Sequence, residues 1–201
     1  MHDLTSIILS ASYIGIFAIV FAETGLLIGF FLPGDSLLIA AGLLAAAPGS
    51  DLNLWGVMAA VVAGGIIGCS VGYWIGQRFG PGVFRHQNSR FFKPEYVAQA
   101  EKFFVQYGAL AVILARFVPI VRTLVPTLAG VSRMPFALFT LYNVIGALLW
   151  GVGVTGLAYY LGGLIPNLDH YILLIVGVVL VVSVIPILLK VLQARRSTPR
   201  P

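Results

Sequence analysis

The chain has 201 residues, of which 59% are hydrophobic and 9% are charged, whereas a soluble globular domain has roughly 45–50% and roughly 25%. Twelve basic and seven acidic side chains cannot cover the surface of a folded 21.5 kDa protein, and the mean hydropathy is +0.99. This composition excludes a soluble enzyme, a disordered tail and a collagen-like fibre, and it predicts an all-α polytopic membrane protein.

Four uncharged, strongly apolar stretches are predicted to cross the membrane, because about 20 apolar helical residues span about 30 Å of hydrocarbon. In chain order they are residues 4–22, 52–77, 136–162 and 171–189. We expect them to belong to one membrane domain that covers residues 1–201. The sequence leaves the oligomeric state open, with a homo-oligomer among the alternatives.

Two further apolar segments, residues 24–47 and 103–130, are interrupted near their centres and are predicted to form re-entrant helical hairpins. Proline removes a backbone donor and breaks the helical ladder, whereas glycine permits a reversal of the chain. Broken helices at membrane depth are tolerated where they are buried in protein or line a wet cavity. The predicted hairpin breaks are Pro33, Gly34, Pro119 and Pro126.

Lysine and arginine gather in a linker, residues 78–102, and in a tail, residues 190–201, which predicts that both segments are cytoplasmic. Their charge suits anionic lipid better than nucleic acid. With four spans and two hairpins, the N-terminus is then cytoplasmic too. The linker is expected to include a helix on the inner membrane surface. Residues 24–77 and 103–162 become two units of opposite orientation, an architecture typical of transporters.

Four ionisable side chains interrupt or border the two hairpins: Glu23, Asp35, Arg116 and Arg122. Intramembrane charges mark ion or substrate pathways by default, although they can also pair merely to hold helices together. Arginine stays charged and presents a planar fork, so the two arginines are the predicted phosphate-binding residues. A carboxylate in a low-dielectric site takes up a proton readily unless it is paired, so the two acids are the predicted proton-coupling residues.

Other polar and small residues carry weaker signals. The lone Cys69 excludes an intramolecular disulfide and a cysteine metal cluster, and no cofactor, metal site or catalytic residue is predicted. Gly68, Gly72 and Gly76 recur at helical spacing, which indicates close helix packing. Asn143 lies within the third span and needs a hydrogen-bond partner, so a packing contact is favoured over a cavity-lining role.

Two stretches resemble the motifs of the DedA family of bacterial inner-membrane proteins. Residues 23–25 (ETG) and 31–35 (FLPGD) resemble its first motif, although Asp35 replaces the glutamate that often ends it. Residues 107–130, which include RFVPIVRT at 116–123, resemble its second motif. The twelve-residue step between the acids and the six-residue step between the arginines agree with the family pattern, so the family's functional positions correspond to the same four charged residues.

This resemblance implies a fold shared with the eukaryotic VTT-domain lipid scramblases, in which two re-entrant hairpins face each other. It also implies transport of lipid carriers across the bacterial cytoplasmic membrane, with proton-motive force as the energy source. We therefore expect a proton-coupled flippase, with a membrane lipid and protons as its partners, that moves undecaprenyl phosphate or a related polyprenyl phosphate for carrier recycling.

Alternative functions stay open at this point. The cargo could be a phospholipid such as phosphatidylethanolamine, or a small cation in proton antiport, since both uses suit buried carboxylates. A polyprenyl-phosphate phosphatase would need a nucleophile and a general acid, most plausibly histidine, beside the arginines. The apolar segments contain no histidine, so we do not expect an enzyme. A purely structural role predicts that the four charged positions tolerate neutral replacement.

Overall fold

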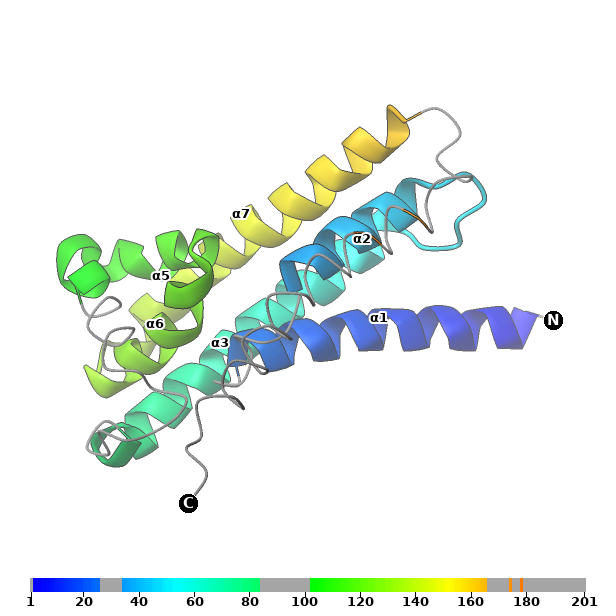
Figure 1. The fold of residues 1–201 in the computed structure, drawn as a ribbon. Coiled ribbons are helices and arrows are strands. Elements are labelled where there is room, and N and C mark those ends of the chain that lie inside the picture. The colour runs from blue at the N-terminus through cyan, green and yellow to red at the C-terminus, as the bar shows by residue number, and fades with distance from the viewer. Residues whose placement is uncertain (1, 26–33, 84–101, 166–173, 175–177, 179–201) are drawn as a thin grey trace, which may run out of the picture.

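The computed structural model describes residues 2–25, 34–83 and 102–165, together with residues 174 and 178. Within these residues the chain forms helices and no strand, which confirms the all-α fold class (Figure 1). The elements are α1 (His2–Gly25), α2 (Gly34–Ala46), α3 (Leu54–Val83), η2 (Gly108–Leu110), α5 (Ala111–Leu114), η3 (Ala115–Phe117), α6 (Pro119–Val131) and α7 (Phe136–Gly163).

Two helices of the described residues are long and apolar enough to cross a membrane, Leu54–Arg78 within α3 and Phe136–Gly163. They coincide with the second and third predicted spans, except that α3 continues to Val83. Large apolar side chains such as Trp55 and Leu149 are exposed on their outer faces. Such a surface is expected where lipid, rather than water, surrounds a helix.

The first predicted span is helical but ends later than expected, at Gly25. The Thr24 hydroxyl donates to the carbonyl oxygen of Val20, 2.8 Å away, within the last turn of α1. Glu23 and Thr24 therefore close α1, whereas the sequence placed the start of a hairpin at residue 24. The chain is described again from Gly34, the first residue of α2. Residues 26–33, with the predicted break at Pro33, lie outside the described residues.

The second interrupted segment breaks in its middle. Residues 102–107 are helical, and η2, α5 and η3 follow as short turns. Val118 is extended, with φ −118° and ψ 104°, and Pro119 then begins α6. Proline disfavours helical backbone in the residue before it but fits the first position of a helix. The structure thus places one break between Val118 and Pro119.

Pro126 was predicted to be a second break in this segment, and that prediction is wrong. Pro126 lies inside α6, which continues to Val131. Its ring removes one backbone hydrogen bond from the helix. The ring packs close to Gly72 of α3, where an added Cβ would lie 3.4 Å from the Cβ of Pro126. Packing against α3 therefore holds the helix together across the proline.

The helix α3 is the centre of the packing and contacts α1, α2, α6 and α7 (Figure 1). Its glycines let neighbouring backbones approach closely: an added Cβ at Gly68 would lie 2.8 Å from the carbonyl oxygen of Phe21, and one at Gly76 would overlap Thr127. The packing role expected for these glycines is therefore what the structure shows. The helix α2 packs mainly against α7, and α6 packs mainly against α3. Each short helix thus lies on the long helix of the other predicted unit.

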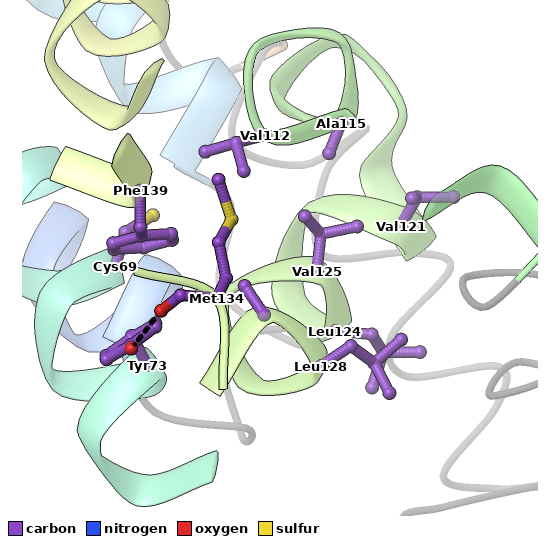
Figure 2. Packing of buried hydrophobic residues seen from close by; sticks show 11 residues of the cluster. Cys69, Tyr73, Val112, Ala115, Val121, Leu124, Val125, Leu128, Met134 and Phe139 are labelled. Carbon is purple, nitrogen blue, oxygen red and sulfur yellow. Dashed lines mark hydrogen bonds between the residues drawn. The ribbon is translucent and has the colours of Figure 1, made fainter. Parts of the chain in front are cut away.

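Buried side chains form two main cores, which lie along different stretches of α3. The first joins α3, α5, α6 and α7, and includes Cys69, Tyr73 and Phe139; in Figure 2 the Tyr73 hydroxyl donates to the Met134 carbonyl oxygen. The second joins α1, α2, α3 and α7, and includes Trp150. The fold therefore has a junction between two cores, and the charged residues lie at that junction.

Several sequence predictions concern residues that the structure does not describe. Most of the linker, residues 84–101, is among them, as are the tail and all but two residues of the fourth span. The interfacial helix and the fourth span remain sequence-based predictions, as does the cytoplasmic placement of both termini.

Candidate functional site

The four predicted charged residues come from four different elements and converge on one place. Glu23 lies in the last turn of α1, and Asp35 lies in the first turn of α2. Arg116 lies in η3, before the break in the second segment, and Arg122 lies in the first turn of α6, after it. Trp150 of α7 completes the cluster, because its ring lies beside both guanidiniums.

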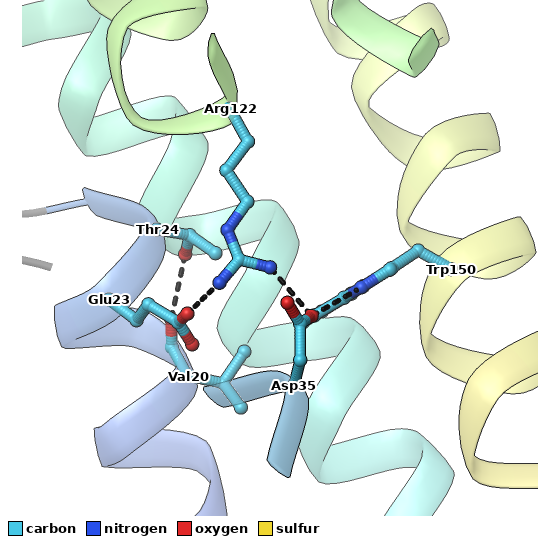
Figure 3. A network of polar contacts seen from close by, with 6 residues as sticks. All are labelled: Val20, Glu23, Thr24, Asp35, Arg122 and Trp150. Atoms are coloured by element: carbon cyan, nitrogen blue, oxygen red, sulfur yellow. Dashed lines mark hydrogen bonds and ion pairs between the residues drawn. The ribbon is translucent and has the colours of Figure 1, made fainter. Parts of the chain in front are cut away.

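Both carboxylates bind the same guanidinium, that of Arg122 (Figure 3). Its Nη1 donates to Oδ1 of Asp35 at 2.7 Å, and its Nη2 donates to Oε1 of Glu23. The Glu23 side chain is fully buried, the Arg122 side chain is 10% exposed and that of Asp35 is 46% exposed. Arg122 therefore carries one buried and one half-exposed ion pair.

Trp150 ties the second carboxylate to α7. Its Nε1 donates to the same Oδ1 of Asp35, at 3.1 Å. The guanidinium carbons of Arg116 and Arg122 lie 5.8 Å and 5.7 Å from the ring centroid of Trp150. At these distances the ring face attracts both cations. One indole thus bonds a carboxylate through its edge and lies next to two arginines.

Glycine at position 34 makes room for the buried acid. A Cβ at Gly34 would overlap the carboxylate of Glu23. The glycine of the predicted first motif is therefore required sterically, because the first turn of α2 lies directly against the end of α1. This contact also explains how a glutamate at the end of one helix and an aspartate at the start of the next reach one arginine.

Arg116 is held differently, because its hydrogen-bond acceptors are neutral. Its Nη2 donates to Oδ1 of Asn143 at 2.6 Å and to the carbonyl oxygen of Gly65 at 3.2 Å. The same nitrogen lies 3.5 Å from the sulfur of Cys69. Across the described ranges no carboxylate forms an ion pair with Arg116, although the residue is 95% buried, with 5% of its surface exposed. The positive charge of Arg116 is therefore hydrogen-bonded by neutral groups and is not balanced by a carboxylate.

A small cavity lies between the two arginines. It is lined by Thr24, Cys69, Val112, Ala115, Arg116, Arg122, Pro126 and Trp150. Cys69 belongs to one core and Trp150 to the other, so the cavity lies where the cores meet. Its volume of about 10 Å³ is about the least that holds one water molecule. A phosphate headgroup does not fit in this closed arrangement.

The sequence identified the four charges but did not single out Trp150. A signal was present, since tryptophan is enriched at membrane interfaces and Trp150 lies near the middle of an uncharged span. For Asn143 the sequence favoured a packing contact over a role at the cavity. In the structure it is fully buried and bonds both Arg116 and the backbone of α3. Among the described residues no cluster of His, Cys, Asp and Glu side chains is arranged to hold a metal ion.

Comparison with known proteins places this site in a wider context. The family profile described as the VTT domain matches residues 32–160. The chain is 42% identical to Protein DedA of Escherichia coli K12 over 188 residues, which cover 94% of this chain and 85% of that protein. It is 44% identical to an uncharacterized membrane protein of Mycobacterium tuberculosis H37Rv over 195 residues, which cover 95% of this chain and 85% of that protein. No solved structure shows significant similarity to the chain.

Proposed function

The chain belongs to the DedA family of VTT-domain membrane proteins, and from that premise we propose that it is a proton-coupled lipid transporter. The cargo is undecaprenyl phosphate or a related polyprenyl phosphate, moved across the bacterial cytoplasmic membrane. The observation that carries the proposal is the pairing of Arg122 with both Glu23 and Asp35. This pairing makes the binding of a phosphate depend on the protonation of the acids.

Phosphate and carboxylate compete for the same donors. Arginine suits phosphate because its fork donates two parallel hydrogen bonds, but both terminal nitrogens of Arg122 already donate to Glu23 and Asp35. A protonated carboxyl group is a weaker acceptor than a carboxylate, so proton uptake releases the fork. Because linkage is reciprocal, phosphate binding then favours protonation to the same extent.

The charges of the cluster support the same coupling. With every group ionised, the two carboxylates cancel the two guanidiniums. Each proton taken up leaves one positive charge in excess, and a phosphate monoester brings roughly 1.5 to 2 negative charges at neutral pH. A neutral assembly at low dielectric is favoured over a charged one. Lipid and proton would therefore move together, toward the cytoplasm when protons are more concentrated outside.

Transport also requires the cluster to open, because its cavity has no room for a headgroup. Asp35 lies in the first predicted inverted unit, Arg116 and Arg122 lie in the second, and Glu23 lies at the end of α1, directly before the first unit. Separation of these units would break the ion pairs and expose the arginines to one side of the membrane. We propose alternating access of this kind, with both termini in the cytoplasm and no enzymatic step.

The test is translocation of labelled undecaprenyl phosphate in proteoliposomes, with and without a pH gradient. We expect the gradient to accelerate transport, and we expect Arg116→Ala and Glu23→Gln to abolish it at unchanged protein levels. Arg78→Gln is the matched control, since Arg78 is an exposed arginine of α3 outside the cluster. Wild-type rates in the two cluster variants would refute the assignment, and phosphate release from the lipid would indicate a phosphatase instead.

A phospholipid with an amine headgroup is the second candidate, and the exposure of Asp35 favours it. The side chain of Asp35 is 46% exposed, and both of the bonds it accepts from Arg122 and Trp150 end on Oδ1. An ammonium group could approach the other oxygen while an arginine holds the phosphate. Labelled phosphatidylethanolamine in the same liposomes separates the two cargoes, because transport of this lipid without transport of undecaprenyl phosphate would favour the second candidate.

A further inference from the structure

The two arginines of the cluster differ in what neutralises them. Arg122 is paired with two carboxylates, whereas Arg116 donates to an amide, a backbone carbonyl and a thiol. Both guanidiniums border the same small cavity. Of the acceptors of Arg116, Asn143 of α7 is the one at the shortest distance.

We propose that Asn143 is a positioning residue that holds Arg116 without a carboxylate partner, so that Arg116 is the permanent half of the phosphate site and Arg122 the exchangeable half. This inference rests on the proposed function and assigns separate roles within it. Arg116 binds the lipid phosphate whether or not the acids are protonated. Arg122 joins only when Glu23 and Asp35 release it. Asn143 acts through Arg116 and not on the lipid.

The amide of Asn143 is fixed at both ends. Its Oδ1 accepts from Arg116, and its Nδ2 donates to the carbonyl oxygen of Ile66 at 3.0 Å and lies 3.5 Å from the Ser70 hydroxyl. The Ser70 hydroxyl in turn donates to the same carbonyl at 2.8 Å. A flipped amide would place its donors against a guanidinium, which has no acceptor. The geometry therefore sets both the orientation of Asn143 and the place of the Arg116 fork.

Room for the guanidinium is made by glycines on both neighbouring helices. An added Cβ at Gly65 of α3 would lie 3.0 Å from Nη1 of Arg116, and one at Gly146 of α7 would lie 3.0 Å from its Cδ. The Trp150 ring, seven residues after Asn143 on α7, lies 5.8 Å from the guanidinium carbon. Neutral groups thus surround Arg116, which suits a site that an incoming anion must enter.

An aspartate at position 143 would reverse this property with almost no change of shape. When ionised, it would put a carboxylate against Nη2 of Arg116 and would lose the donor to Ile66. Because a carboxylate paired with a guanidinium stays ionised, Asn143→Asp neutralises the Arg116 fork at a chosen atom.

Other ionisable groups face this position and set the background for a pH experiment. Arg116 from η3 and Cys69 from α3 are the nearest. Arg122 from α6, with the carboxylates of Glu23 from α1 and Asp35 from α2, lies at the Trp150 end of the cluster. These groups are present in the wild type and in every Asn143 variant, so the difference between their pH profiles isolates position 143.

The experiment compares wild type, Asn143→Asp and Asn143→Ala in proteoliposomes that carry labelled undecaprenyl phosphate, at about pH 5 and about pH 8. We expect Asn143→Asp to lower the rate about tenfold or more at both pH values, the size of a bond to a charged group, because its carboxylate is paired with Arg116 and stays ionised. Asn143→Ala removes an acceptor that holds the Arg116 guanidinium in place. The KM of this variant for the lipid should therefore rise without a new pH dependence.

Three outcomes would overturn the inference. They are wild-type behaviour of the aspartate variant at both pH values, an equal loss in both variants at both pH values, and a wild-type KM in the alanine variant. If the aspartate variant does not fold, the KM of the alanine variant decides the test. Absence of lipid transport in the wild type would refute the proposed function, whereas wild-type transport with any of the three outcomes refutes only the role of Asn143.

Discussion

Replacing Arg122 with methionine should destabilise the protein strongly, because it leaves a carboxylate buried without its partner. The Glu23 side chain is fully buried and that of Arg122 is 10% exposed. Removing one member of such a pair costs about 3–5 kcal/mol. In a chain of this length each 1 kcal/mol shifts Tm by about 2–4 °C. We therefore expect Tm to fall by about 6–20 °C on thermal unfolding in detergent micelles.

Neutral replacement of Asp35 should cost much less stability than loss of the ion pair between Glu23 and Arg122. Asp35→Asn should cost no more than about 1 kcal/mol, because 46% of the Asp35 side chain is exposed and exposed ion pairs contribute little to stability. Adding Glu23→Gln to Arg122→Met should restore part of the lost stability, since the double variant no longer buries an unpaired charge. A double-mutant cycle would then give a coupling of at least about 1.5 kcal/mol for this pair.

A different result would refute this reasoning. Additivity of Glu23→Gln and Arg122→Met within about 0.5 kcal/mol is what independent sites show, and it would mean that the two side chains do not interact in the folded protein. A larger loss from Asp35→Asn than from Arg122→Met would mean that burial does not decide the strength of the pairs. Arg78→Gln provides the control for loss of an exposed arginine.

Three further predictions concern sterics, the tryptophan and access to the cavity. Gly34→Ala should lower both Tm and transport because its Cβ would overlap the Glu23 carboxylate, whereas Gly153→Ala, where an added Cβ meets nothing within 4 Å, should leave Tm unchanged or slightly raised. Trp150→Phe keeps a ring beside the arginines but removes the bond to Asp35, so transport should fall less than in Trp150→Leu. Cys69, the chain's one cysteine, is 5% exposed and lines the cavity, so maleimide labelling should be slow until transport conditions open the cluster; equal labelling in both conditions would contradict opening.

Much of this architecture could be predicted because membrane insertion restricts the sequence. The spans at α3 and α7 are long uncharged runs, and a helix satisfies every backbone group of such a run within the segment itself. The charges stood out for the same reason, since each costs roughly 2.5–3.5 kcal/mol at mid-membrane on insertion scales. The break before Pro119 follows from the restriction that proline places on the preceding residue.

Other features depend on contacts that no local pattern encodes. Pro126 has the same backbone chemistry as Pro119, but the groove at Gly72 keeps α6 continuous around it. Tyr73 and Trp74 are adjacent aromatic residues of one span, but Tyr73 is buried and donates to the Met134 carbonyl, whereas Trp74 is exposed. Composition shows that an aromatic residue is present, whereas packing decides whether it faces lipid or the core.

The division between the two arginines shows most directly where sequence reasoning stops. Arg116 and Arg122 are six residues apart in one motif, so the sequence predicts the same phosphate-binding role for both. Their difference comes from partners 27 to 99 residues distant along the chain. One arginine meets the acids at the ends of α1 and α2, and the other meets an amide on α7. A phosphate that binds between them therefore meets one fork that is already free of carboxylate and one that is released only by protons, and this asymmetry would tie proton uptake to the movement of the lipid.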